Sequence, residues 1–119
     1  MARVKRSINA QKKRRKVLDE AKGYWGLKNS SYRRAKEQVI KSGTYAYRDR
    51  RARKRDFRRL WITRISAGCK QNDINYSTFM NGLKKAGIGL NRKMLSELAI
   101  ADAEGFTALV AQAKAALQQ

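Results

Sequence analysis

The chain of 119 residues contains no histidine and no proline, a single cysteine and only nine acidic residues. Without histidine, the sequence lacks the commonest general base and a common metal ligand. Because proline is absent, nothing in the chain forbids long helices. The single cysteine, Cys69, excludes an intramolecular disulfide and a cysteine metal cluster, and we interpret it as a small buried thiol on a helix.

Long apolar runs are also missing. No segment of about 20 apolar residues is available to span a membrane, and no apolar run follows the basic N-terminus, as it would in a signal peptide. The acids are scattered, and the adjacent pair Asp19 and Glu20 is interpreted as offsetting neighbouring cations. Gly87-Ile88-Gly89 follows a predicted helix, not a strand, and is no phosphate loop. We therefore predict no enzyme activity, no metal, no cofactor and no small-molecule substrate.

The charge that is present has mostly one sign and lies mostly in the first half. Residues 1–60 hold 22 Lys and Arg against 5 Asp and Glu, a net charge of +17, whereas residues 61–119 hold 7 against 4, a net charge of +3. Such a basic segment repels itself and is expected to be disordered or only partly helical when free. It needs a polyanion to become compact, and nucleic acid is the densest biological polyanion.

Two helical stretches are expected within the basic half. Residues 1–9 have the composition of an extended basic tail, and residues 10–22 are compatible with a helix. Gly23 and Gly26 then predict a break or a bend around the aromatic residues between them.

A second helix is expected to begin at Tyr32, after the N-cap candidates Asn29, Ser30 and Ser31. Local propensity predicts a break or kink at residues 42–44, where Gly43 stands between a serine and a threonine. Beyond this point every residue to about Lys70 tolerates a helix.

The segment 48–59 carries the densest charge. On a helical wheel its eight Arg and Lys residues cover an arc of roughly 240°. A helix that lies on a membrane needs a broad apolar stripe, which this segment lacks. Seven of the eight are arginine, whose planar guanidinium group makes bidentate phosphate contacts and stacks on bases. The pattern favours a polyanion that surrounds the helix.

The second half has the composition of a small all-α domain. Trp61, Ile65 and Cys69 recur at four-residue spacing and form one apolar stripe. Three short helices follow, over about 77–86 and 92–99 and after Asp102, with Gly87 expected in the left-handed conformation after the first. The helix N-cap candidates are Asn75 or Ser77, Asn91 and Asp102. The predicted buried residues are Phe79, Met80, Leu83, Leu95, Leu98, Phe106, Leu109, Val110, Ala113 and Leu117.

Aromatic residues are interleaved with the arginines, an arrangement that allows bases to stack while cations hold phosphates. Tyr24 and Trp25 lie beside glycines, and their partner is left open between RNA and a neighbouring protein. Phe57 and Trp61 are interpreted as docking onto the small core. Cations at the start of the 92–99 helix are candidates for a phosphate site, and a plain charged surface is the alternative.

Several motifs resemble one known family. They are GYWGLK at 23–28, YRRAKEQV at 32–39, YAYRDRR at 45–51, KRDFRRLWI at 54–62, YSTFMNGLKKA at 76–86 and LNRK at 90–93. Together they resemble the twentieth protein of the bacterial large ribosomal subunit, the L20 family, over essentially the whole chain. The resemblance implies one helix from about Tyr32 to Lys70 that passes through Gly43, and we adopt this expectation over the local break.

The resemblance implies an all-α fold in which a long basic helical extension, residues 1–59, penetrates rRNA and a small domain of about four helices, residues 60–119, lies on the rRNA surface. It implies a structural constituent of the large ribosomal subunit, in the cytoplasm, that binds 23S rRNA directly and promotes early subunit assembly. Neighbouring ribosomal proteins would be further partners. In some members of the family the small domain also binds the protein's own messenger RNA and represses its translation.

The predicted rRNA contacts combine three aromatic residues with the cations of both halves. They are Tyr24, Trp25, Tyr32, Arg3, Lys5, Arg6, Lys12, Lys13, Arg14, Arg15, Lys16, Arg33, Arg34, Arg48, Arg50, Arg51, Arg53, Lys54, Arg55, Arg58, Arg59, Lys84, Lys85, Arg92 and Lys93. An architectural DNA-binding protein is the alternative that composition leaves open. A membrane-active peptide is disfavoured by the missing apolar face.

Overall fold

The computed structural model describes residues 7–118, which contain helices and loops only. There are five α-helices and one short 3-10 helix in this range, and the chain divides into two compact units, Met1–Arg51 and Ala52–Gln119. The predicted all-α class is confirmed.

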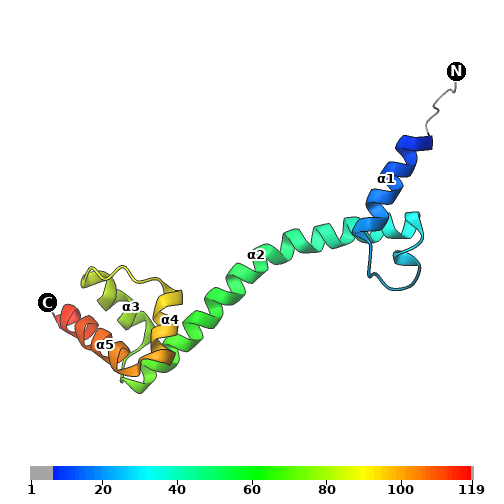
Figure 1. Ribbon diagram of the computed structural model, residues 1–119. Helices are drawn as coiled ribbons and strands as arrows, with labels where there is room; N and C mark the ends of the chain where they lie inside the picture. The colour runs from blue at the N-terminus through cyan, green and yellow to red at the C-terminus, as the bar shows by residue number, and fades with distance from the viewer. Residues whose placement is uncertain (1–6, 119) are drawn as a thin grey trace. The chain divides into compact units, whose positions relative to one another are not determined.

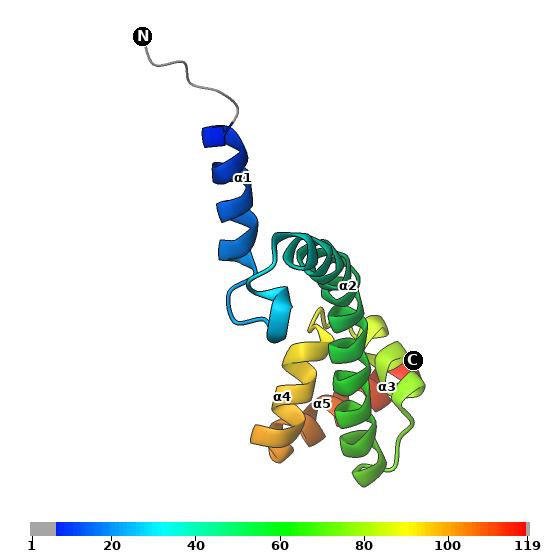
Figure 2. The same ribbon diagram turned by 90° about the vertical axis from the view of Figure 1, so that its right-hand side faces the viewer.

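The first unit contains helix α1 (Ser7–Glu20), the 3-10 helix η1 (Gly26–Lys28) and the beginning of helix α2 (Tyr32–Gln71). The predicted break between the two helices is confirmed, because Gly23 and Gly26 both have positive φ, at 84° and 62°. Figure 2 shows the connecting loop between α1 and the start of α2. The prediction of an extended tail is wrong for residues 7–9, which form the first turn of α1 since nothing in them interrupts the helical pattern.

Helix α2 is continuous from Tyr32 to Gln71, so the local break predicted at residues 42–44 is wrong and the long helix implied by the family resemblance is confirmed. A glycine inside an exposed helix costs only about 1 kcal/mol relative to alanine. The two hydroxyl side chains beside it are satisfied without leaving the helix. Ser42 Oγ accepts a hydrogen bond of 2.9 Å from the Tyr24 hydroxyl, and Thr44 Oγ1 donates one of 3.1 Å to the Ile40 carbonyl.

The second unit packs the last part of α2, residues 52–71, with helices α3 (Tyr76–Lys85), α4 (Arg92–Ala101) and α5 (Ala103–Gln118) (Figure 1). Helix α5 lies against both α3 and α4. The rings of Phe79 and Phe106 meet with their centroids 5.3 Å apart. The core contains Ile65, Cys69, Ile74, Phe79, Leu83, Leu95, Phe106, Val110 and Ala113, with Met80, Leu98 and Leu109 partly buried against it.

Two of the three predicted side-chain caps in the second unit form, whereas Asn75 precedes α3 without a side-chain cap hydrogen bond. Asn91 Oδ1 accepts a hydrogen bond of 2.9 Å from the Met94 amide, and Asp102 Oδ1 accepts one of 2.9 Å from the Gly105 amide. Gly87 has the expected positive φ, 73°, which lets the Ile88 amide donate to the Leu83 carbonyl. These bonds satisfy backbone groups that a helix end leaves without partners.

Helix α2 ends in the same way without a glycine. Asp73 takes a φ of 52°, and the Ile74 amide donates to the Cys69 carbonyl at 3.1 Å. The Lys114 ammonium then donates a 2.8 Å hydrogen bond to the Asn72 carbonyl. A cation at a helix C-terminus is favoured by the helix dipole, so this bond ties α5 to the end of α2.

Gly82 allows α3 and α5 to approach closely. A Cβ atom added there would lie 2.6 Å from the Ala113 carbonyl oxygen and 2.8 Å from its Cβ. Because the obstacle includes backbone, we expect Gly82→Ala to lower the free energy of unfolding of the second unit by about 1–3 kcal/mol. Gly89→Ala is the matched control, since it meets nothing within 4 Å. Urea unfolding followed by circular dichroism measures both, and equal stability of the two variants would contradict the close approach.

Cys69 is fully buried in the core, as predicted, and burial raises the pKa of its thiol to about 11. The unfolded chain loses this proton at lower pH, so stability contributed by the thiol is present below pH 9 and is lost as pH rises from 9 through about 11. We expect a water-soluble disulfide reagent to modify Cys69 slowly at pH 8 in the folded protein and rapidly in guanidinium chloride. Equal rates in both solutions would show that the thiol is accessible.

Candidate nucleic-acid interface

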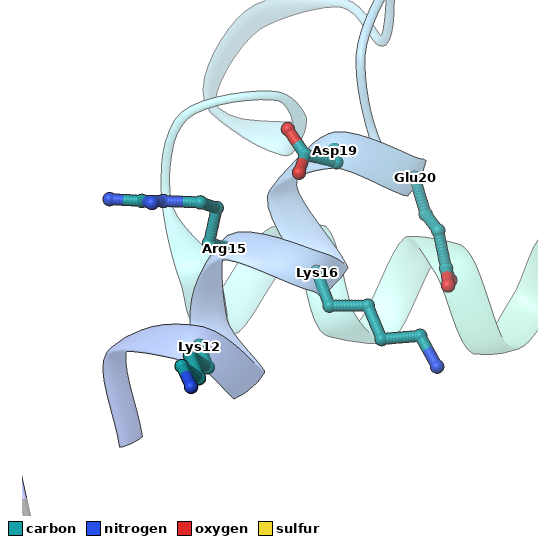
Figure 3. Close-up of a pocket in the computed structure, with 5 residues that line it drawn as sticks. All are labelled: Lys12, Arg15, Lys16, Asp19 and Glu20. Carbon is teal, nitrogen blue, oxygen red and sulfur yellow. The ribbon is translucent and has the colours of Figure 1, made fainter. Parts of the chain in front are cut away.

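Helix α1 presents a run of exposed cations, and none of its residues is buried. Consecutive helical residues are 100° apart, so five adjacent cations place positive charge on every side of the helix. Figure 3 shows three of them together with Asp19 and Glu20, which lie one turn further along. Lys22 Nζ lies 3.0 Å from Asp19 Oδ1, so this acid does offset a neighbouring cation. The exposed run is Lys12, Lys13, Arg14, Arg15 and Lys16.

A groove lies between α1 and the start of α2. The Arg14 guanidinium is 5.8 Å from the centre of the Tyr32 ring, within range of a cation–π contact. The groove therefore combines positive charge with an aromatic face. Sequence reasoning identified Arg14, Tyr32 and Arg33 but missed Lys36 and Ile40. The lining residues are Arg14, Tyr32, Arg33, Lys36, Glu37 and Ile40.

Two tyrosines of α2 hold cations against their rings. The Arg51 guanidinium lies 3.6 Å from the centre of the Tyr47 ring, and its Nη1 donates a 3.2 Å hydrogen bond to the Tyr47 carbonyl. Tyr45 has Lys41 and Arg48 at 5.8 and 4.8 Å from its ring centre. Arg51 and Lys41 stand four residues from their tyrosines, a spacing that places side chains on one face of a helix. The predicted contacts did not include Tyr45, Tyr47 or Lys41, but the four-residue spacing between a cation and a tyrosine could have indicated these ring contacts.

The eight cations of residues 48–59 are all exposed on α2. Arg48 Nε donates a 2.8 Å hydrogen bond to Asp49, and this bond raises the pKa of Arg48 above its ordinary value. Arg59 lies 4.0 Å from Asp56. Such exposed pairs are screened by water and salt and contribute little to stability. The two acids therefore leave the segment strongly positive.

Four further cations that were predicted to contact rRNA lie on the second unit. Lys84 and Lys85 occupy the last turn of α3, and Arg92 and Lys93 begin α4. The Arg92 Nε donates a 2.8 Å hydrogen bond to the Tyr76 hydroxyl, which orients the guanidinium group. The two lysines and Lys93 are exposed, whereas Arg92 is half-buried. Arg92 therefore contacts the start of α3, whereas Lys84 and Lys85 lie at its other end, about 12 Å along the helix axis.

The aromatic residues divide into inward and outward groups. Tyr24 is half-buried, whereas Trp25 is 91% exposed. The interpretation that Phe57 docks onto the core is wrong, because its side chain is 49% exposed. Phe57 instead pairs with half-buried Trp61, at a centroid distance of 6.2 Å. The four-residue spacing that makes an apolar stripe also lets two rings cover one another on the helix surface.

The predicted residues Arg3, Lys5 and Arg6 lie outside the residues that the structure describes. Within residues 7–118, no group of three or more His, Cys, Asp or Glu side chains could hold a metal ion. The helices of this range also include none that is long and apolar enough to cross a membrane. The described surface is therefore distinguished by positive charge and by exposed aromatic rings.

Sequence comparison with known proteins identifies the family to which these features belong. A family model described as Ribosomal protein L20 matches residues 3–109. The chain is 56% identical over 117 residues to the large ribosomal subunit protein bL20 of Acetivibrio thermocellus, covering 98% of this chain and 100% of the relative. It is 58% identical over 118 residues to the protein of the same name from Staphylococcus aureus strain JH9, covering 99% and 100%.

The Tyr47 ring is expected to hold the Arg51 guanidinium in place for contact with RNA. We expect Tyr47→Leu to weaken binding to a structured RNA by about two- to five-fold, because an exposed cation–π contact contributes about 0.5–1 kcal/mol to holding the cation in place. Tyr47→Phe keeps the ring and should bind as the unchanged chain does. Fluorescence anisotropy of a labelled RNA measures both variants. Equal losses in the two would assign the effect to the hydroxyl group and contradict the role of the ring.

Proposed function

Because the chain belongs to the ribosomal protein L20 family, and is therefore a structural constituent of the large ribosomal subunit and not an enzyme, we propose that it binds 23S rRNA directly. As part of the ribosome it is located in the cytoplasm. The single observation that supports direct binding most strongly is the exposed cationic segment 48–59 of α2. The alternative of an architectural DNA-binding protein has no support among the relatives, which are ribosomal proteins.

Neutralisation of phosphate charge supplies the mechanism. Each phosphate that a cation contacts releases condensed counterions, and this release favours binding at low salt. Where several RNA strands converge, their mutual repulsion opposes compaction, and a cationic helix between them reduces it. The protein would thereby promote early assembly of the subunit. The proposal includes folding of the basic half on RNA, since its own charge opposes a compact free state.

We propose a division of labour along the chain. Residues 1–59 act as the extension that enters the rRNA, and residues 60–119 act as a small domain on its surface. The exposed side chains of Lys84, Lys85 and Lys93, together with Arg92 held by Tyr76, support an RNA contact by the second part. The family resemblance extends that proposal to the protein's own messenger RNA. Neighbouring ribosomal proteins complete the set of proposed partners.

Charge reversal in the densest segment tests direct binding. We expect Arg51→Glu combined with Arg55→Glu to reduce affinity for a 23S rRNA fragment by more than ten-fold while the helices of the second unit stay folded. Arg64→Glu with Lys70→Glu is the control, because it changes the charge equally at exposed positions of the same helix. Filter binding measures affinity, and thermal unfolding by circular dichroism checks the fold.

The affinity for the rRNA fragment should depend on salt concentration. If eight phosphates are engaged, log affinity should fall against log salt with a slope of about −6 to −7, and the Arg51/Arg55 double variant should have a shallower slope by about 1.5. A slope near −1 for the unchanged chain, or an unaltered affinity in the double variant, would overturn the proposal.

A further inference from the structure

We propose that Trp25 is a base-stacking site, at which the indole ring stacks on one unpaired nucleobase of the bound RNA. The inference rests on the proposed RNA-binding function and names the chemistry of one contact within it. It concerns a part of the surface that charge alone does not explain, namely an exposed apolar ring in the loop between two basic helices.

The loop between α1 and α2 turns two adjacent aromatic residues in different directions. Tyr24 is half-buried, and its hydroxyl donates a 2.9 Å hydrogen bond to Ser42 Oγ on α2. Trp25 follows with an extended backbone, φ −79° and ψ 139°, which directs successive side chains to opposite sides. Its side chain is 91% exposed. Tyr24 thus anchors the loop, and Trp25 is presented to the surroundings.

Hydrogen bonds and two glycines shape the backbone on both sides of Trp25. Gly23 and Gly26 adopt positive φ values, which L side chains rarely adopt. The Tyr24 amide donates to the carbonyl of fully buried Ala21 at 3.1 Å, and the Ser31 amide donates to the Leu27 carbonyl at 2.9 Å. Once the basic half has folded on RNA, these hydrogen bonds hold the backbone that carries the ring. The loop is therefore suited to presenting a flat surface.

The charge around Trp25 indicates which kind of partner its exposed ring would contact. Trp25 lies between Lys22 and Lys28, both exposed. Its unit, residues 1–51, holds 17 Lys and Arg against 4 Asp and Glu. Nucleobases stack on aromatic rings regardless of sequence, and the positive charge of this unit attracts the phosphates that flank a stacked base. A protein pocket for the indole would have to be acidic as well as apolar, so an unpaired base is the better match.

The test uses the indole as its own reporter. Trp61→Phe leaves Trp25 as the single tryptophan of the full-length chain, which contains two. This variant is titrated with a 23S rRNA fragment that contains bulged nucleotides and with a fully paired RNA duplex of equal length. We expect the bulged fragment to quench the fluorescence of Trp25 and the duplex to leave it nearly unchanged, even where the duplex binds through charge.

Two substitutions then separate stacking from apolar contact. Trp25→Leu should weaken binding to the bulged fragment by about five- to one-hundred-fold, the effect of losing one stacked base. Trp25→Phe should restore most of that affinity. The salt slope should stay the same in both, because no phosphate contact is removed. Since the indole is 91% exposed, neither change removes a contact of the fold.

The outcomes distinguish this inference from the function on which it rests. Stacking would be overturned if Trp25→Leu binds with wild-type affinity and RNA does not quench Trp25 in the Trp61→Phe variant. In that case the loss of affinity in the Arg51/Arg55 double variant would still support RNA binding through charge. Quenching that occurs only in assembled subunits, and not with naked rRNA, would assign the indole to a protein neighbour and also overturn stacking. Failure of the unchanged chain to bind either RNA would overturn the proposed function itself.

Discussion

Repulsion between like charges is the constraint on which the molecule depends. In the first 60 residues, 22 cations face only 5 acids, and four of those acids form local pairs, such as Asp19 with Lys22 and Asp49 with Arg48. Exposed pairs of this kind contribute little, so the positive charge of α1 and α2 is not balanced within the chain. Under the proposed function, the phosphates of rRNA supply the missing counter-charge.

The second unit gives this charge a fixed support. Its part of α2 carries Arg53 to Arg59 and then, within three turns, the buried residues Ile65 and Cys69. The core is small, so it depends on close approach of α3 and α5 at Gly82 and on satisfied helix ends. Lys114 adds a bond from α5 to the end of α2. Because the buried residues and the cations lie on the same helix, packing of the core also sets the direction in which the cations of this unit project.

Local chemistry predicted most of the second unit, because its signals are short in range. Asn91, Asp102 and Gly87 act as predicted, since a cap involves residues three or four apart. Prediction failed where a distant group decides the outcome. The helix continues through Gly43, whose neighbour Ser42 bonds to Tyr24, 18 residues away. At the site, charge was visible in the sequence, but the ring that holds Arg51 and the outward direction of Trp25 depend on conformation.

Charge and aromatic contact supply different parts of recognition. Coulomb attraction to a phosphate chain acts over about 8 Å at physiological salt and barely depends on how the protein is rotated. A helix with cations over most of its circumference would by charge alone bind in many registers. Stacking requires contact and parallel planes, so a ring such as Trp25, or a guanidinium held flat by Tyr47, accepts few arrangements. In the proposed RNA complex, affinity would therefore come mainly from the cations, and a single binding register would come from the few exposed rings placed among them.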